Sequence, residues 1–239
     1  MIKKFKDISE LSQYAARSFI EIANKSIEER GRCLAALSGG STPMRLYELL
    51  GNQFQNEVDW TQVHFFWGDE RCVPVDDPGN SYGQAKKVLF DRINIPTENI
   101  HRVNSDLAPD SAATDYAHTL KLFSEPPLDW PRFDLALLGM GEDGHTASLF
   151  PGSPVDMDSP TLAVTANYQG RPANRVTLTP NVLNSSRNVL FLVTGRAKAV
   201  TLRGVLSDIY VAEKLPAQRI KPTDGNLIWL IDEEAGSLL

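Results

Sequence analysis

Hydrophobic and polar positions along the chain follow two alternating patterns. Short apolar runs with the length of buried strands occur near residues 32–37, 63–67, 133–138, 189–194 and 226–231. Further extended pieces lie near residues 161–166 and 174–179, and helical patterns lie at residues 8–30, after Pro43, at 81–92, at 110–123 and from Arg196. Strands that alternate with helices predict βαβ units, so we expect an α/β fold with a parallel sheet.

The segments between these elements predict one domain. Residues 125–131 and 151–160 are rich in proline and are predicted loops, but neither is long or polar enough for an interdomain linker. We therefore expect a single domain over residues 1–239. Residues 1–22 are amphipathic with scattered charges, which predicts a first helix rather than a signal peptide. No segment approaches the roughly 18 apolar residues of a membrane span, so we expect no membrane partner.

Charge and cysteine content narrow the classes of function. The net charge of −6 argues against non-specific nucleic-acid binding, which needs concentrated Lys and Arg, but it still allows an anionic small substrate attracted by a few basic residues in a cleft. With only Cys33 and Cys72 we expect reduced thiols and a cytosolic (cytoplasmic) protein. The histidines at 64, 101 and 118 lack metal-ligand spacing, so no structural zinc site is expected.

The segment FDLALLGMGEDGHTASLFPG, residues 133–152, joins an apolar strand to a glycine-rich turn that carries Glu142, Asp143 and His145. Ligands bind in α/β proteins at turns of this kind. An imidazole titrates near neutrality, and a neighbouring carboxylate can orient it, so His145 is the leading candidate for a general base. A structural, hydrogen-bonded histidine is the alternative. We also expect a helix to begin at residues 146–148.

A second turn, LSGGSTP, follows the run CLAAL and precedes a helix. Free backbone N–H groups at a helix N-terminus bind anions, and the hydroxyl groups of this turn would add donors. The alternative is that Ser41 or Thr42 merely caps the helix. The spacing matches neither a P-loop nor a serine-hydrolase elbow. The candidate phosphate-binding residues of this turn are Gly39, Gly40, Ser41 and Thr42.

Two further motifs place charges after apolar strands. HFFWGDERCVP runs directly into Asp69, Glu70 and Arg71, which form either part of a ligand site or a structural ion-pair cluster. VLFLVTGRAKA puts Lys198 beside a helix N-terminus, where a cation is unfavourable unless an anion offsets it. Arg175, in NRVTLTP, is a weaker phosphate candidate of the same kind.

Taken in order, SGGSTP, WGDERCVP, GMGEDGHTASLFPG, RVTLTP and VTGRAKA closely resemble the 6-phosphogluconolactonases of the pentose phosphate pathway, over residues 5–235. SGGSTP is shared with the related glucosamine-6-phosphate deaminases, whereas GHTASLFP and GDERCVP favour the lactonase branch. The resemblance implies a mainly parallel, Rossmann-like sheet with helices on both faces. It also implies hydrolysis of 6-phospho-D-glucono-1,5-lactone to 6-phospho-D-gluconate without a metal or organic cofactor.

Carried over by motif, the resemblance implies roles for individual residues. His145 would be the general base for the attacking water, and Asp143 would orient it. The substrate phosphate would be held by Arg71, Lys198, Arg175 and the turn at residues 39–42, with Asp69 beside them. The chain has Asn80 before Ser81, where the family has the opposite order, so Asn80 is left out of the predicted catalytic set.

Two other functions stay open from the sequence. A glucosamine-6-phosphate deaminase or another sugar-phosphate isomerase would use the same phosphate turn, with Asp69 or Glu70 as the base. A non-catalytic sugar-phosphate sensor would need a DNA-binding partner domain, and the chain has no basic helix-turn-helix segment. The expected partner is a small sugar phosphate. The oligomeric state is not fixed by the sequence, and we favour a monomer.

Overall fold

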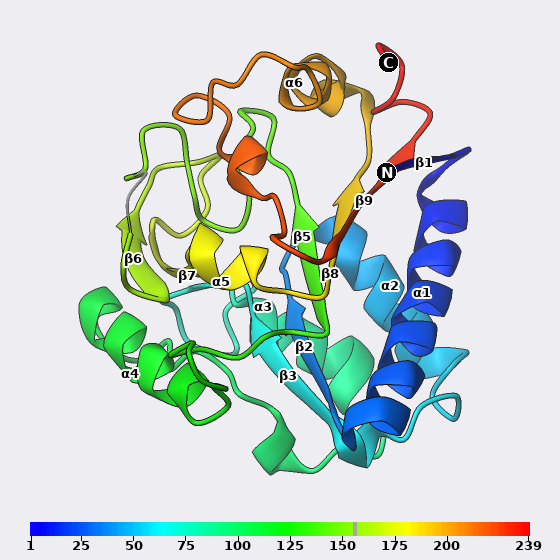
Figure 1. Ribbon diagram of the computed structural model, residues 1–239, viewed down its shortest axis with the longest axis vertical. Coiled ribbons are helices and arrows are strands. Elements are labelled where there is room, and N and C mark those ends of the chain that lie inside the picture. The colour runs from blue at the N-terminus through cyan, green and yellow to red at the C-terminus, as the bar shows by residue number, and fades with distance from the viewer. Residues whose placement is uncertain (155–156) are drawn as a thin grey trace.

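The central element is a six-stranded sheet whose neighbouring strands are all parallel, in the order β1-β9-β8-β5-β2-β3. The structure is a computed structural model that describes residues 1–154 and 157–239. The strands are β1 (Ile2–Phe5), β2 (Cys33–Leu37), β3 (Val63–Trp67), β5 (Leu135–Gly139), β8 (Asn188–Val193) and β9 (Asn226–Asp232). Figure 1 shows the sheet in the middle of the molecule, with the two termini close together.

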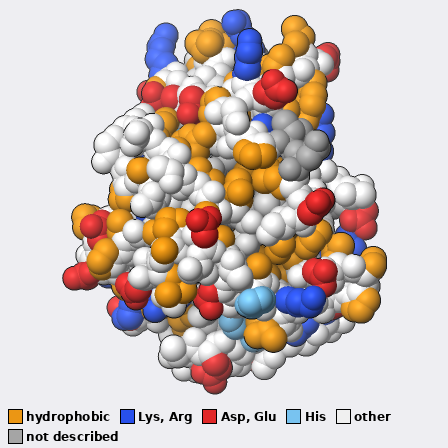
Figure 2. All heavy atoms as spheres, turned by 90° about the vertical axis from the view of Figure 1, so that its left-hand side faces the viewer, with side chains coloured by type: hydrophobic (Ala, Val, Ile, Leu, Met, Phe, Trp, Pro, Cys, Tyr) orange, Lys and Arg blue, Asp and Glu red, His pale blue; other side chains and the backbone are white. Residues whose placement is uncertain are grey.

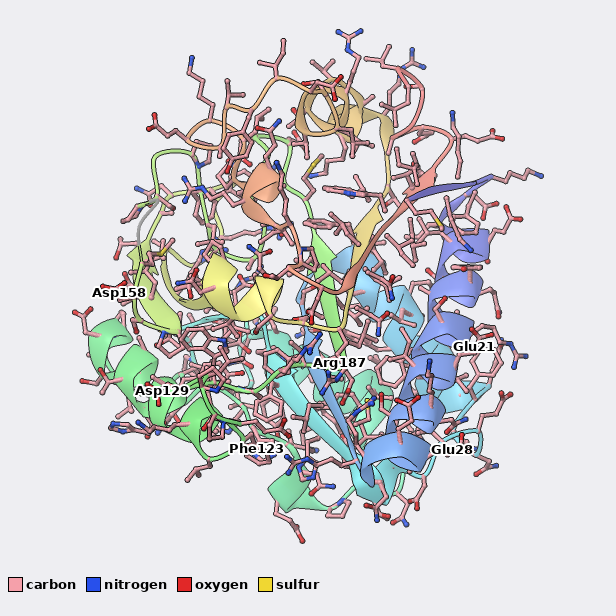
Figure 3. All side chains as sticks on the ribbon, in the orientation of Figure 1. Glu21, Glu28, Phe123, Asp129, Asp158 and Arg187 are labelled. Atoms are coloured by element: carbon pink, nitrogen blue, oxygen red, sulfur yellow. The ribbon has the colours of Figure 1, made fainter. Side chains whose placement is uncertain are left out.

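One face of the sheet packs against α1 (Ile8–Arg30), α2 (Ser41–Asn52) and the helical segment that begins with α3 (Ser81–Ala85). Alternate strand residues such as Ala35 and Leu137 point into this layer and are fully buried. Asp7 caps the N-terminus of α1 by accepting the N–H groups of Ser9 and Glu10. Glu21 and Glu28 are exposed on the outer side of α1 (Figure 3), as expected for an amphipathic helix.

The other face packs against α4 (Pro109–Lys121), α5 (Pro180–Asn184), α6 (Ala199–Val205) and a small antiparallel sheet. That sheet has the order β4-β7-β6, with β4 (Asp69–Arg71), β6 (Thr161–Thr165) and β7 (Asn174–Leu178). Strand residues of the opposite alternation, including Phe66 and Phe191, fill this second core. On the molecular face in Figure 2, acidic, basic and apolar side chains are interspersed, without a continuous basic surface.

The α/β class, the mainly parallel sheet and the helices on both faces are confirmed. Two local predictions are wrong, and a third is confirmed as helical but differs in helix type. Residues 2–5 form the edge strand β1 rather than part of the first helix. Residues 146–148 form a turn instead of a helix, because Ala147 adopts a positive φ of 48° that ends any helical path. The segment predicted as one helix at 81–92 is α3 followed by a π-helical turn over Lys86–Phe90.

The predicted loops also lie where the pattern places them. Residues 125–131 contain neither helix nor strand. Within 151–160, residues 155–156 lie outside the described part of the chain, and the remaining residues are turns and irregular structure. Within the described residues, no helix has the length and apolar character needed to cross a membrane. Because every strand of the large sheet is parallel, the turns after β2, β5 and β8 meet at one edge.

Candidate functional site

A cavity of about 180 Å³ lies at the carboxyl ends of the parallel strands. The turns after β2, β5 and β8 form its floor, and the connection between β6 and β7 forms a further wall. Of the sequence-predicted site residues, the structure places nine around this cavity: Gly39, Gly40, Ser41, Thr42, Asp69, Arg71, His145, Arg175 and Lys198. The tenth, Asp143, contacts His145 directly. The fold thus brings the predicted residues together from segments far apart in the chain.

His145 and Asp143 form a hydrogen-bonded pair in the turn after β5. Nδ1 of His145 lies 2.6 Å from Oδ1 of Asp143, and the backbone N–H of His145 donates to the same oxygen at 3.1 Å. Gly141 makes this turn possible, because a Cβ at that position would collide with the imidazole ring and with the Asp143 carboxylate. Burial raises the pKa of Asp143, but hydrogen bonding and the charge of His145 outweigh it and lower that pKa below its ordinary value.

Two aromatic rings hold the His145 imidazole from different sides. The ring centroid of Phe150 lies 4.5 Å away, and that of Tyr168 lies 4.6 Å away in an edge-on arrangement. Among the described residues, Nε2 of His145 has no hydrogen-bond partner. With Nδ1 donating to a carboxylate, the neutral ring carries its lone pair on Nε2. The arrangement therefore presents a proton acceptor in the cavity.

The turn at residues 39–42 begins α2, and the interpretation of Ser41 or Thr42 as its cap is wrong. The cap position is Gly40, with a φ of 107° and no side-chain hydrogen bond to the helix. The hydroxyl group of Thr42 instead lies 2.9 Å from that of Thr194, in the turn after β8. The backbone N–H groups of Ser41 and Thr42 thus receive no side-chain cap, and both residues line the cavity. They suit an anion.

Asp69, Glu70 and Arg71 do not form the ion-pair cluster that the sequence left open. The buried Glu70 carboxylate accepts three backbone N–H groups, from residues 71, 81 and 82, each at 2.8 Å, and so anchors the loop that leads into α3. Asp69 accepts a hydrogen bond of 2.6 Å from the Ser148 hydroxyl group. Arg71 donates to the carbonyl oxygen of Gly79 at 2.8 Å, while its buried Nε has no partner within residues 1–154 and 157–239.

Arg71 and Arg175 are direct cross-strand partners on β4 and β7, and both line the cavity. Like charges directly opposite one another destabilise a sheet. Arg175 is only 2% exposed, its guanidinium carbon lies 5.3 Å from the centroid of the Phe150 ring, and its Nε and Nη2 have no partner among the described residues. A buried cation with free donors is costly until an anion meets it.

Lys198 adds a third predicted cation at the turn after β8, where a short helical segment, Arg196–Lys198, leads into α6. Burial lowers the pKa of Lys198, and the nearby Glu142 and Asp143 carboxylates offset part of that effect. Burial likewise lowers the pKa of Arg175. The cavity therefore concentrates positive charge in a protein whose net charge is −6.

Sequence reasoning missed the contribution of the connection between β6 and β7. Tyr168, Gln169 and Arg171 from this connection line the cavity, and the hydroxyl group of Tyr168 accepts the backbone N–H of Glu142 at 3.3 Å. The only sequence signal was a polar turn, YQGRP, between two extended pieces. Asn80 does not line the cavity: it is buried, caps α3 through Gly83 N–H and donates to the Val73 carbonyl oxygen and the Ser105 hydroxyl group.

Metal-binding groups are not evident in the part of the chain that the structure describes, where no cluster of three or more His, Cys, Asp or Glu side chains could hold an ion. Cys33 is buried, Cys72 is partly buried, and both are free thiols. The polar groups of the cavity are therefore backbone amides, hydroxyl groups, carboxylates, cations and one imidazole.

Comparison with known proteins gives a consistent result. The family model described as glucosamine-6-phosphate isomerases/6-phosphogluconolactonase matches residues 6–229. A 6-phosphogluconolactonase from Synechocystis is 41% identical over 217 residues, which cover 90% of this chain and 88% of the relative.

Solved structures show the same overall fold. That of the 6-phosphogluconolactonase from Thermotoga maritima has a TM-score of 0.85 and 31% identity, covering 97% of this chain and 99% of that one. A monomeric glucosamine-6-phosphate deaminase also has a TM-score of 0.85, with 24% identity and coverage of 100% and 99%, which shows the shared fold alone. The extent of the family match and the identity to the Synechocystis relative together place this chain in the glucosamine-6-phosphate isomerase/6-phosphogluconolactonase family.

Proposed function

We propose that this protein is a 6-phosphogluconolactonase, which hydrolyses 6-phospho-D-glucono-1,5-lactone to 6-phospho-D-gluconate. The proposal rests on one observation: the same cavity holds a cationic site that suits a phosphate group and a histidine that can act as a base. Arg71 and Arg175 lie opposite each other with unpartnered nitrogen atoms, which suits a phosphate group. His145, oriented by Asp143, supplies a base for water. The relatives from Synechocystis and Thermotoga maritima carry the same activity in their names.

In the proposed reaction, Nε2 of His145 takes a proton from a water molecule as the water oxygen attacks the lactone carbonyl carbon. Asp143 stabilises the imidazolium ion that results. The tetrahedral intermediate then collapses with cleavage of the bond between the carbonyl carbon and the ring oxygen. The ring oxygen leaves as a hydroxyl group after it receives the proton held on His145. Water and lactone are consumed, the acid is formed, and the imidazole returns to its neutral state.

The phosphate group would be anchored at a distance from this reacting carbonyl. Arg71, Arg175 and Lys198 supply cationic donors, and the backbone N–H groups at the start of α2 supply neutral ones. Such remote binding fixes the lactone ring relative to the base and lowers the entropic part of the barrier. We also propose a cytosolic location, which the two free thiols support.

A sugar-phosphate isomerase or deaminase is the alternative that shares this fold. Glu70 is poorly placed to be its base, because three backbone N–H groups already occupy the buried carboxylate and Glu70 does not line the cavity. Asp69 does line the cavity, with one oxygen bonded to Ser148. Ammonia release from glucosamine 6-phosphate would identify that reaction.

The test is the hydrolysis of freshly generated 6-phosphogluconolactone, followed by formation of 6-phosphogluconate and corrected for the spontaneous rate. Unphosphorylated gluconolactone serves as the matched substrate without the anchor. We expect acceleration of the phosphorylated lactone far above that of gluconolactone. No acceleration over background would overturn the proposal.

A further inference from the structure

A second cavity lies at the opposite edge of the large sheet from the candidate active site. Its volume is about 350 Å³, and its lining residues are Arg30, Arg32, Leu34, Glu125, Arg132, Asp134 and Arg187. Arg32 immediately precedes β2, Arg132 comes just before β5, and Arg187 immediately precedes β8. These are neighbouring parallel strands, so their amino ends meet at one edge. We call this cavity the arginine cavity.

The arginine cavity and the candidate active site lie at opposite ends of the same strands, about one strand length apart. The strands β2 and β5 each contain five residues. At about 3.3 Å per residue, the two edges of the sheet lie roughly 17 Å apart. The two cavities share no lining residue. An anion in the arginine cavity would therefore not be the phosphate group of a substrate bound beside His145.

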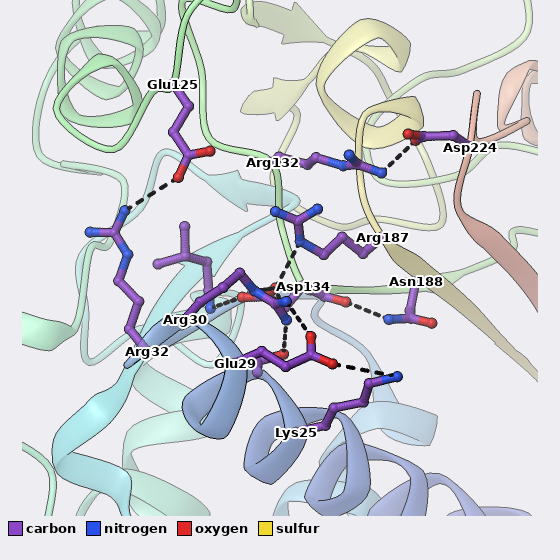
Figure 4. Close-up of polar contacts among 12 residues, drawn as sticks. Lys25, Glu29, Arg30, Arg32, Glu125, Arg132, Asp134, Arg187, Asn188 and Asp224 are labelled. Carbon is purple, nitrogen blue, oxygen red and sulfur yellow. Dashed lines mark hydrogen bonds and ion pairs between the residues drawn. The ribbon is translucent and has the colours of Figure 1, made fainter.

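One buried carboxylate accounts for part of the arginine cluster. Asp134 is 3% exposed, and its Oδ1 accepts Nε of Arg30 at 3.1 Å and Nε of Arg187 at 3.2 Å. Its Oδ2 accepts the backbone N–H of Leu34 at 2.9 Å. Asp134 thus fixes two guanidinium groups at the base of the cavity and has little capacity left for the others (Figure 4).

The remaining donors of the cluster are poorly satisfied. Arg187 uses only Nε, and its two terminal nitrogen atoms point away from Asp134 (Figure 4) with no partner among the described residues. Arg32 lies 4.0 Å from Glu125, its one ion pair among the described residues, and its guanidinium carbon lies 5.9 Å from the centroid of the Phe123 ring. Arg132 contacts Asp224 through Nη2 at 2.5 Å, while its buried Nε has no partner in the part of the chain that the structure describes. The Arg187 side chain, labelled in Figure 3, is 27% exposed.

The lining carries a surplus of positive charge. Four arginines face two carboxylates, Asp134 and Glu125. The Glu125 side chain is 68% exposed. Two further carboxylates outside the lining pair with lining arginines: Asp224 with Arg132, at 63% exposure, and Glu29 with Arg30 at 2.5 Å, at 45% exposure. Solvent screens these three exposed carboxylates, so they neutralise the cavity only in part. Guanidinium groups present paired N–H donors in a plane, which matches the oxygen atoms of a phosphate group.

We propose that the arginine cavity binds a dianionic phosphate group, as free phosphate or as a phosphate monoester, at a site distinct from the one that holds the substrate. The terminal nitrogen atoms of Arg187 and the guanidinium groups of Arg32 and Arg132 would donate to it. Asp134 would hold Arg187 in place rather than contact the ligand. The proposal stands whether or not the lactonase activity does, because it uses no residue of that site.

The test measures phosphate binding directly at the arginine cavity. The Nε–H signal of Arg187 is followed by nuclear magnetic resonance during titration with inorganic phosphate, at an ionic strength held constant with chloride. We expect a saturable shift of this signal. The variant Arg32→Gln/Arg132→Gln should weaken binding by at least about tenfold, because it removes two charged donors. Arg17→Gln, which removes an arginine paired with Glu57 on the outer side of α1, should bind as the wild type does.

The outcomes separate the proposal from a purely structural role of the cluster. No saturable shift in the wild type, or equal weak shifts in the wild type and the double variant, would overturn it. The wild-type titration decides the matter even if the double variant folds poorly. Glycerol 3-phosphate as a second probe separates the sources: tighter binding than inorganic phosphate supports a phosphate monoester as the ligand, and equal binding supports free phosphate.

Discussion

A single carboxylate oxygen, Oδ1 of Asp143, accepts both the ring Nδ1–H and the backbone N–H of His145, at 2.6 and 3.1 Å. The two contacts fix the ring relative to its own backbone, so the imidazole cannot turn without losing a charge-assisted hydrogen bond. They also select the tautomer that leaves Nε2 free to accept a proton. The orientation of the proposed base is therefore set within three consecutive residues.

Replacement of the proposed base should remove most of the catalysis. We expect His145→Ala to lower kcat for 6-phosphogluconolactone by about 10²–10⁴-fold with little change in KM, because the ring acts on water rather than on the phosphate group. Steady-state kinetics corrected for spontaneous hydrolysis would measure this. His118→Ala, at an exposed position on α4, is the matched control and should keep wild-type kinetics. Intact turnover in His145→Ala would refute the mechanism.

Loss of the Lys198 cation should mainly raise KM, whereas loss of His145 should mainly lower kcat. We expect Lys198→Met to raise KM for the phosphorylated lactone by about 10–100-fold, since a hydrogen bond to a charged group contributes about 1.5–3 kcal/mol. Turnover of unphosphorylated gluconolactone should not change, because that substrate has no phosphate group for Lys198 to bind. Lys121→Met removes a lysine that pairs with Asp129 at the surface and serves as the control. An equal loss with both lactones would argue against a phosphate contact.

A small change in the turn should separate catalysis from stability. Gly141→Ala adds a methyl group where the His145 ring and the Asp143 carboxylate lie, so one of them must move. Misplacement of a catalytic group by about 1 Å can cost about 10²-fold in rate. We expect a loss of kcat of that order in a protein that still unfolds cooperatively. Gly152→Ala is the control for backbone strain: its φ of 82° makes alanine costly to stability, but nothing lies within 4 Å of a Cβ there, so kcat should stay near the wild-type value.

Much of the fold was predictable because the parallel strands are buried on both faces. β2, for example, is buried at all five positions, and such strands appear in the sequence as continuous apolar runs bounded by turns. The turns that follow them carry the candidate site, because the carboxyl ends of parallel strands meet at one edge. Asp143, His145 and Lys198 could therefore be placed near one another before any contact was known.

The other features of the fold and of the candidate site depend on pairing between strands, which the local sequence does not indicate. The strand β1 contains only IKKF and exists through its pairing with β9, more than two hundred residues away. The strand β4 is DER, a sequence with no apolar run, and its antiparallel pairing with β7 sets Arg71 opposite Arg175. Tyr168 and Arg171 reach the cavity only because β6 and β7 form a hairpin. Tertiary contacts outweighed local preference in each case.

A histidine pair far from the candidate active site predicts a pH dependence of stability. His64 Nδ1 and His101 Nε2 lie 3.1 Å apart, and the His101 ring also packs against Phe66 and Phe123. Burial, with a smaller contribution from the charge of His64, lowers the pKa of His101 from 6.5 to about 4. Below the ordinary pKa the unfolded chain therefore binds a proton that the folded protein does not. Linkage then requires that stability fall as pH drops from 6.5 toward 4.

The variant His101→Gln tests this linkage, because glutamine does not titrate. At neutral pH the variant should be less stable than the wild type, since it loses ring packing. The difference between their free energies of unfolding should shrink at about pH 5, where the wild type alone carries the penalty of a histidine held neutral. Urea unfolding at both pH values measures it, with His118→Gln as a control at an exposed position. A difference that is constant with pH would mean that His101 is protonated in the folded protein as readily as in the unfolded chain.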